Sequence, residues 1–293
     1  MLRATCAFAP SLVPPLPPSP GVFAGTWDLS GWDLAILVLL FAIGGAYVAA
    51  LARSWRRAGV GRGIRLWEAW AFAAGWAALL TALIGLDGLS GVLFSAHMTQ
   101  HELLMLVAAP LVVLGRPLVV LVWLLPAHLR LRIRRAQRPL ALGVWRRLTA
   151  PVTVLLVHGV VVWLWHAPAL FEAALQSEAI HALQHLCFFW TALLFWWALV
   201  HGRYGRVGYG VAVAFVFVTA MHTTLLGALL TFAPTVWYPT YEVTVAARGA
   251  SAIEDQQLAG LLMWVPSGVI FLLIGLGLFA AWLGESARRS ASA

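Results

Sequence analysis

Two copies of a His-x-x-Gln-His pattern are the part of this sequence best suited to chemistry. The first copy spans residues 97–101 and the second spans residues 181–185. In a helix, residues four apart lie on the same face, so each copy can direct two imidazoles to one point. The glutamine of each copy, Gln100 or Gln184, can hydrogen-bond the second nitrogen of a ligating ring and fix its tautomer. Because polar groups are costly in an apolar segment, the repeated pattern predicts a metal site rather than packing alone.

Further histidines are predicted to approach the same point. His166 closes a hydrophobic segment, and the short connection 167–180 leads from it to the second motif. His158 lies eight residues before His166, about 12 Å along a helix, and a hydrogen bond between helices explains a single histidine there equally well. The predicted ligands are His97, His101, His166, His181 and His185. Candidates for additional ligands, or for groups that orient the ligands, are His158, His222, Met98, Met221, Gln100, Gln184, Asp255 and Gln256.

The composition places these residues in membrane-spanning helices. The chain has 293 residues, of which 62% are hydrophobic and 10% are charged, whereas soluble domains carry about 25% charged residues. Seven stretches approach the roughly 20 apolar residues that a helix needs to cross a membrane, at about 31–52, 67–86, 95–115, 150–167, 181–200, 209–231 and 257–283. Aromatic residues at 188–190 and 195–197 are expected to face lipid or the membrane interface. We therefore expect an all-α, polytopic membrane protein with seven transmembrane helices, a Pro-rich N-terminal segment at 1–30, a membrane domain at 31–284 and a cytoplasmic tail at 285–293.

Arginine supplies all 19 positive charges, and the chain contains no lysine. Seventeen of these arginines follow the first, third, fifth and seventh stretches, so they fall on one side of the membrane. By the positive-inside rule, the N-terminus is outside and the C-terminus is cytoplasmic. Both histidine motifs then lie near the outer face, where most of the acidic residues also fall. The net charge of +8 thus reflects topology, and no nucleic-acid partner is predicted.

The type of metal follows from the residues around the imidazoles. Imidazole binds zinc, copper, iron and nickel, but a zinc protease needs a second histidine after His101-Glu102 at a spacing that is absent here. Haem is a less favoured cofactor, because each histidine has a partner only four residues away, which crowds a macrocycle and suits a bare ion. The outer position favours copper. Two alternatives stay open, a haem-binding electron carrier and a metal-free scaffold whose histidines tie helices together.

Four segments resemble the CtaG-type assembly factor of caa3-type cytochrome c oxidases, and the resemblance covers about residues 30–285. They are the first motif with Ala109-Pro110-Leu111 and Leu114-Gly115-Arg116-Pro117, the segment Trp165-His166-Ala167-Pro168 with Leu170-Phe171-Glu172, the second motif with Leu194-Phe195-Trp196-Trp197, and Asp255-Gln256-Gln257-Leu258-Ala259-Gly260 with Met263-Trp264-Val265-Pro266. The resemblance implies a multi-pass protein of the bacterial inner membrane that helps to mature a copper-containing oxidase and is not an enzyme. It implies oxidase subunits as partners, beside the lipid bilayer, and it implies metal binding by His97, His101, His166, His181 and His185. Asp255 and Gln256 belong to the family motif without an assigned chemistry.

A mechanism follows as an expectation. Acidic groups at the outer face collect copper, the imidazoles hold it at the rim of the bilayer, and an oxidase subunit accepts it by ligand exchange. Because an imidazole binds metal in its neutral form, binding is expected to weaken as the pH falls through the histidine range.

Overall fold

The computed structural model describes residues 31–135, 139–201 and 209–291, which are helical and contain no strand. The predicted N-terminal segment 1–30 lies outside these ranges. In chain order the elements are α1 (Gly31–Ala58), α2 (Leu66–Leu80), η1 (Thr81–Gly85), α3 (Asp87–Ser90), α4 (Phe94–Glu102), η2 (Leu103–Ala108), α5 (Ala109–Leu114), α6 (Pro117–Leu121), η3 (Val122–Leu124), α7 (Ala127–Arg135), α8 (Pro139–Leu148), α9 (Pro151–Trp165), α10 (Pro168–Gln176), α11 (Glu178–His201), α13 (Tyr209–Thr231), α14 (Pro239–Ala246) and α15 (Ala252–Ala291). The all-α class predicted from the sequence is therefore confirmed.

Six helical segments of the described chain are long and apolar enough to cross a membrane. They are α1, α2 with η1, α4 with η2 and α5, α11, α13 and α15. The stretch predicted at 150–167 forms α9, which has only 15 residues and is followed by α10 at a bend of 69°. This helix stops at Trp165 because Pro168 has no N–H to donate and restricts the residue before it. The seventh span thus remains a prediction.

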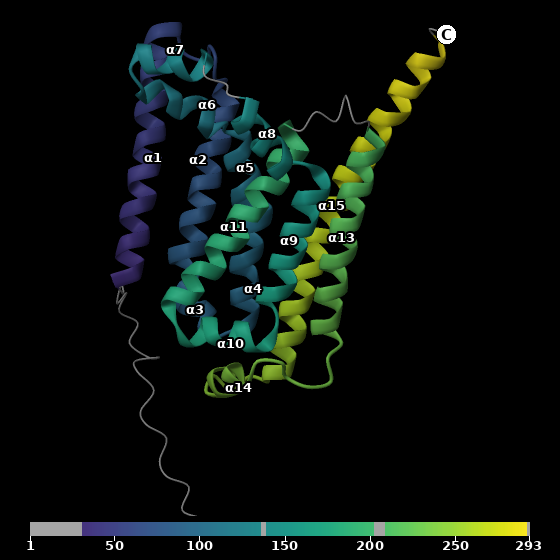
Figure 1. Cartoon of the computed structure of the whole chain (residues 1–293). Helices are drawn as coiled ribbons and strands as arrows, with labels where there is room; N and C mark the ends of the chain where they lie inside the picture. The colour runs from purple at the N-terminus through teal and green to yellow at the C-terminus, as the bar shows by residue number, and fades with distance from the viewer. Residues whose placement is uncertain (1–30, 136–138, 202–208, 292–293) are drawn as a thin grey trace, which may run out of the picture.

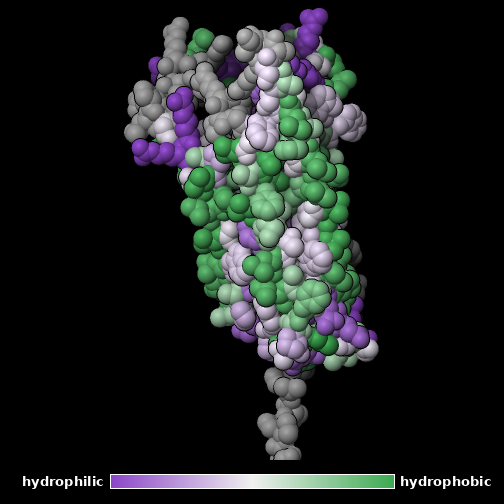
Figure 2. Space-filling model, turned by 90° about the vertical axis from the view of Figure 1, so that its right-hand side faces the viewer, coloured by the Kyte–Doolittle hydropathy of each residue, from purple (hydrophilic) through white to green (hydrophobic). Residues whose placement is uncertain are grey.

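The two ends of the bundle differ in composition. At one end, called here the arginine end, lie α6, α7 and α8 (Figure 1). At the opposite end, called the histidine end, α3, α10 and α14 lie across the bundle, and α9 leads from α8 at the arginine end to α10 at the histidine end (Figure 1). Figure 2 shows apolar side chains over the middle of the visible face and hydrophilic groups toward both ends. This distribution is what a bilayer requires of the protein surface.

Aromatic side chains build much of the interior. Phe188 and Phe195 are 0% and 2% exposed, and Trp196 is 5% exposed, whereas Trp190 is 58% exposed. The expectation that residues 188–190 and 195–197 face lipid is therefore wrong for Phe188, Phe195 and Trp196. The sequence marks the buried side of α11, because Phe188 and Phe195 continue the helix face on which His181, Gln184 and His185 lie.

A π-helix interrupts the helix that carries the first histidine motif. The segment η2 follows α4 directly and leads into α5, which has Pro110 in its first turn. Proline cannot donate a backbone hydrogen bond, and a wider turn before it accommodates this loss. The indole N–H of Trp196 donates a hydrogen bond of 2.8 Å to the carbonyl of Met105 within η2. The irregular turn is thus held by the neighbouring helix α11.

Candidate metal centre

The two histidine motifs occupy equivalent positions on two adjacent helices. Residue 97 is the fourth residue of α4, and residue 181 is the fourth residue of α11. Both helices begin at the histidine end (Figure 1). The first two turns of each helix therefore carry two histidines. His166 follows the last residue of α9 at the same end.

Five imidazole rings form one group, called here the histidine cluster: His97, His101, His166, His181 and His185. The centres of neighbouring rings are 4.1 Å apart for His181 and His185, 4.4 Å for His97 and His101, 5.0 Å for His97 and His181, 5.3 Å for His101 and His185, and 6.3 Å for His101 and His166. The structure therefore brings together all five predicted ligands, and they come from three separate helices.

Three members of the cluster are close enough to share one ion. His97, His101 and His185 each offer a ring nitrogen, and these three nitrogens lie within 4.8 Å of one another. Three nitrogens that bind the same ion at about 2.0 Å each are about 3.5 Å apart or less. The nitrogens would therefore have to close by about 1.3 Å at most to reach bonding range.

The cluster is enclosed by protein. His97 and His101 are at most 1% exposed, and His166 and His185 are also buried. Phe171 of α10 and Phe188 of α11 are fully buried, and their ring centres lie 4.9 Å from His97 and 4.7 Å from His101. Several ring nitrogens in the described part of the chain have no hydrogen-bond partner: Nε2 of His97, His166 and His185, and both nitrogens of His101. A neutral imidazole has one lone pair, and buried polar atoms are nearly always paired in native proteins, so one unpartnered nitrogen of each of these rings fits a bound metal ion.

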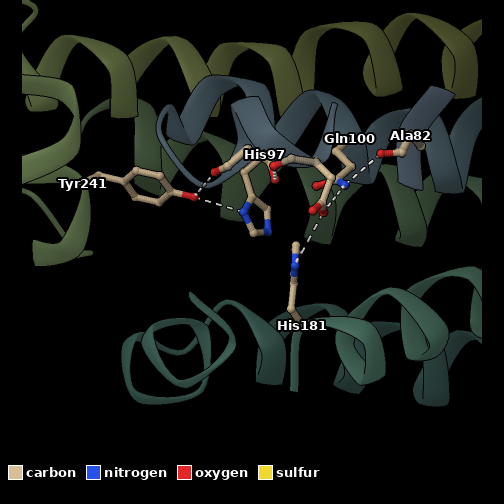
Figure 3. Close-up of polar contacts among 7 residues, drawn as sticks. Ala82, His97, Gln100, His181 and Tyr241 are labelled. Carbon is tan, nitrogen blue, oxygen red and sulfur yellow. Dashed lines mark hydrogen bonds and ion pairs between the residues drawn. The ribbon is translucent and has the colours of Figure 1, made fainter. Parts of the chain in front are cut away.

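Tyr241 of α14 fixes the tautomer of His97. The hydroxyl group of Tyr241 donates a hydrogen bond of 2.8 Å to the carbonyl of Ser90 and lies 3.0 Å from Nδ1 of His97 (Figure 3). The hydroxyl has one hydrogen, which Ser90 accepts, so Nδ1 of His97 must be the donor to the Tyr241 oxygen. The lone pair of His97 is then on Nε2, the nitrogen without a partner. The sequence did not predict this contact.

Tyr241 remains a neutral phenol in this environment. Burial raises the pKa of the Tyr241 hydroxyl well above its usual range, and the negative charge of Asp255 acts in the same direction. A phenol that keeps its proton continues to donate to Ser90. The orientation of His97 is therefore insensitive to alkaline conditions that would ionise an exposed tyrosine.

His166 has the same tautomer as His97, with the proton on Nδ1. Its Nδ1–H donates a hydrogen bond of 2.7 Å to the carbonyl of Val162, one turn earlier on α9. The carbonyl of His166 accepts a hydrogen bond of 2.8 Å from the hydroxyl of Tyr238. The backbone and the ring are thus both fixed, and Nε2 of His166 carries the free lone pair.

Gln100 does not orient an imidazole ring as predicted. Gln100 donates a hydrogen bond of 2.8 Å from Nε2 to the carbonyl of Ala82, and the same atom lies 3.5 Å from the Asp87 carboxylate (Figure 3). Asp87 in turn lies 3.9 Å from Nδ1 of His181. Gln100 therefore supports a carboxylate that faces the cluster rather than a ring. Gln184 is fully buried beside His97.

Asp255 and Gln256 hold helices together outside the cluster. The carboxylate of Asp255 accepts hydrogen bonds from the N–H of Phe94, at 2.7 Å, and from the hydroxyl of Ser95. Gln256 accepts a hydrogen bond of 2.7 Å from the N–H of Trp237 and donates to the carbonyl of Thr235. Asp255 thus caps the start of α4, three residues before His97, and gives this family-motif residue a structural role.

The remaining candidates lie apart from the cluster. Met98 is buried in the main core, whereas Met221 is 54% exposed on the surface of the bundle. His158 and His222 lie near each other, with ring centres 6.5 Å apart, but neither ring contacts a ring of the cluster. The structure therefore separates the seven candidate histidines into a cluster of five and a pair.

A small cavity leads toward the cluster. It has a volume of about 50 Å³, and its lining includes Asp87, Glu178, His181 and His185 together with side chains of α1 and η1. This volume is enough for a water molecule or a bare ion. Two carboxylates at the cavity favour the approach of a cation, as the acidic outer surface predicted.

Comparisons with known proteins show which family and which proteins this chain is similar to. Residues 45–285 match the family model described as cytochrome c oxidase caa3 assembly factor. The chain is 25% identical over 285 residues to the uncharacterized protein Mb0105 of Mycobacterium bovis and to the uncharacterized protein MT0111 of Mycobacterium tuberculosis. The match covers 94% of this chain but 42% of each relative, so the chain spans about two fifths of their length. No solved structure matches it.

Proposed function

The chain belongs to the cytochrome c oxidase caa3 assembly factor family, and from this premise we propose that it carries copper for a copper-containing cytochrome c oxidase. The histidine cluster binds the ion, and an oxidase subunit accepts it. The ion is cargo, so the role is binding and delivery rather than catalysis.

One observation carries the proposal. The ring nitrogens of His97, His101 and His185 lie within 4.8 Å of one another in a buried position. Fixed tautomers of His97 and His166 add to it, because their Nδ1 atoms are bonded to protein and their Nε2 lone pairs stay available. Histidines that bind a metal ion through one ring nitrogen typically hydrogen-bond a protein group through the other.

The donor set favours copper. A cluster of neutral imidazoles suits copper and zinc, while magnesium and calcium require oxygen ligands. Zinc in a structural site would take four ligands in a closed tetrahedron, but delivery requires a site that another protein can enter. The three close nitrogens, with His181 beside them at the cavity, provide an incomplete coordination sphere that supports transfer.

The arrangement does not favour haem. A haem with two axial histidines needs a free slot for the macrocycle between the rings. In the cluster, the centre of each imidazole lies within about 4 to 6 Å of the centre of another imidazole or of a phenylalanine ring. A bare ion requires no such slot.

Orientation and span number belong to this proposal. We assign α9 as a seventh crossing, because it connects the arginine end with the histidine end although it is short (Figure 1). Seven crossings with the arginine end in the cytoplasm place the N-terminus and the histidine end outside, on the outer side of a bacterial inner membrane. A cation then reaches the cluster from the outer side, past Asp87 and Glu178.

Copper titration of the purified full-length chain tests the proposal. The variant with His97, His101, His181 and His185 changed to alanine, called here the cluster variant, is expected to bind fewer copper ions than wild type. His128→Ala changes an exposed histidine at the arginine end and is expected to leave binding unchanged. Equal copper binding by wild type and the cluster variant would exclude a copper site in the cluster and favour a scaffold role. The cluster variant in cells is then expected to lower the copper content of the oxidase.

A further inference from the structure

His158 and His222 form a pair inside the bundle, away from the cluster. His158 is on α9 and His222 is on α13, and their ring centres are 6.5 Å apart. Nε2 of His222 lies 3.7 Å from the place that a side-chain carbon on Gly159 would take. The nitrogen-bearing edge of His222 is thus directed toward α9, at the residue next to His158.

A threonine fixes the tautomer of His158. The hydroxyl of Thr191 donates its hydrogen to the carbonyl of Cys187, at 2.9 Å, with Phe188 as a second acceptor at 3.2 Å. Nδ1 of His158 lies 3.0 Å from the same oxygen. Because the hydroxyl hydrogen is already used, Nδ1 of His158 must donate to Thr191, and the lone pair of His158 is on Nε2. His158 therefore has the same tautomer as His97 and His166.

His222 has unused nitrogens. In the part of the chain that the structure describes, both ring nitrogens of His222 are enclosed and have no hydrogen-bond partner. A histidine that only tied two helices together would hydrogen-bond a group on the other helix. The contacts of His222 provide no such bond, although a buried polar atom is costly to leave unpaired in a membrane.

The spacing of the two rings fits one ion with two ligands. Two bonds of about 2 Å and the distance from each nitrogen to its ring centre add up to roughly 6 Å when the nitrogens lie on opposite sides of the ion. A tetrahedral arrangement would bring the ring centres about 1 Å closer. The observed 6.5 Å slightly exceeds even this linear span, so a nearly linear site requires the smallest movement of the rings, and cuprous and silver ions accept such a site whereas zinc does not.

The surroundings of the pair favour a monovalent ion. The observed partners of the two rings are Thr191, Phe195 and Gly159, which are all uncharged. Without a carboxylate to compensate, the cost of burying an ion grows steeply with its charge. We propose that His158 and His222 form a second metal site, deeper in the bundle than the cluster, which binds one cuprous ion between two imidazoles.

This site is separate from the cluster. His158 and His166 are eight residues apart on α9, which corresponds to about 12 Å of helix rise, so no single ion can join both groups. The site extends the proposed function, because its cargo is the copper that the cluster would take up. Its own evidence is the geometry of the pair, which does not depend on the cluster.

The test uses the full-length protein with cuprous ions as the probe, in competition with a coloured cuprous chelator. The cluster variant is expected to retain one tightly bound cuprous ion. Adding His222→Ala to it is expected to weaken binding of this ion at least 100-fold, whereas adding His128→Ala leaves it unchanged. X-ray absorption of the retained ion is expected to show the edge feature of two-coordinate copper. His222→Gln replaces His222→Ala if the alanine variant fails to elute as a single species.

Thr191 supplies a second readout. Thr191→Val in the cluster variant removes the acceptor of His158 and is expected to weaken cuprous binding about 10- to 100-fold, while Thr191→Ser restores it. Absence of a bound cuprous ion in the cluster variant would overturn the second site while leaving the cluster proposal intact. A retained ion that persists after His222→Ala would overturn it as well. Wild type that binds no more copper than the cluster variant would instead overturn the cluster proposal alone.

Discussion

The cluster and the pair use the same side chain in two different ways. In the cluster, α4 and α11 each contribute two imidazoles four residues apart, and α9 adds a fifth ring at its end. In the pair, α9 and α13 contribute one imidazole each. In both places a protein oxygen accepts the Nδ1–H of one ring, so the lone pair is left on Nε2. The number of imidazoles thus depends on how many histidines one helix face presents, while the tautomers of His97 and His158 depend on neighbouring helices.

Loss of the His101 ring is the most direct test of the difference between the cluster and the pair. His101→Ala is expected to weaken copper binding at the cluster by more than 100-fold, because this ring belongs to the group of three close nitrogens and is 1% exposed. The pair should keep its ion. Copper competition titrations of this variant and of His128→Ala measure the effect, and equal affinities would contradict a role for His101.

The tautomer of His97 is the next most sensitive feature. Tyr241→Phe removes the oxygen that accepts the Nδ1–H of His97 and is expected to weaken copper binding at the cluster about 10- to 100-fold. Tyr209→Phe, which removes a hydroxyl near the arginine end of α13, serves as the matched control. Both variants are titrated with copper and checked for thermal stability. Unchanged affinity in Tyr241→Phe would show that the phenol does not orient His97.

The packing of α13 affects the pair more than the cluster. A side-chain carbon on Gly260 of α15 would lie 2.6 Å from the backbone nitrogen of Thr231 and 2.7 Å from the carbonyl of Gly227, so Gly260→Ala must push α13 away. We expect a loss of about 1–3 kcal/mol in the free energy of unfolding and a weaker second copper site, since His222 is on α13. Gly268→Ala, with open space around it on the same helix, is the control. Thermal unfolding and cuprous titration measure both effects, and equal behaviour of the two variants would contradict the assigned packing.

The access cavity is expected to change the rate rather than the affinity. Asp87→Asn removes a charge beside His181 and should slow copper uptake a few-fold at low ionic strength, with a smaller effect at high salt. Glu242→Gln, an exposed acid on α14, should leave the rate unchanged. Stopped-flow mixing with copper measures the rates. A change in the number of bound ions instead would place Asp87 among the ligands.

The sequence predicted the cluster better than it predicted the surroundings. The repeated spacing of residues 97–101 and 181–185 was sufficient to predict that four imidazoles converge, because the geometry of a helix fixes their face and the topology fixes their depth. Tyr241 could not be found in the same way. It reaches His97 across 144 residues of sequence, and no periodic pattern connects a loop helix with a transmembrane helix.

The fold was predictable in class but less so in detail. Hydropathy located the long apolar helices, because their length is fixed by the bilayer, but it failed for the side of α11 that carries Phe188, Phe195 and Trp196. Hydropathy alone gives no side, but these rings lie near the face of α11 that His181, Gln184 and His185 mark, so the spacing of the motif indicates the buried side. The stretch at 150–167 located α9, but hydropathy did not predict the bend of 69° that separates α9 from α10 before Pro168.

The π-helix η2 sets the direction in which the side chains of α4 point relative to those of α5. A single π-turn contains one residue more than an α-turn, so the side chains before it are rotated by about 100° relative to an uninterrupted α-helix. His97 and His101 lie before this extra residue, and α5, which packs on α2 and α11, lies after it. Deletion of one residue between 103 and 108 would therefore keep the helix apolar and of spanning length, yet turn both imidazoles away from α11. In this protein the apolar composition determines that the segment can span a membrane, and the number of residues in η2 determines the direction of its imidazoles.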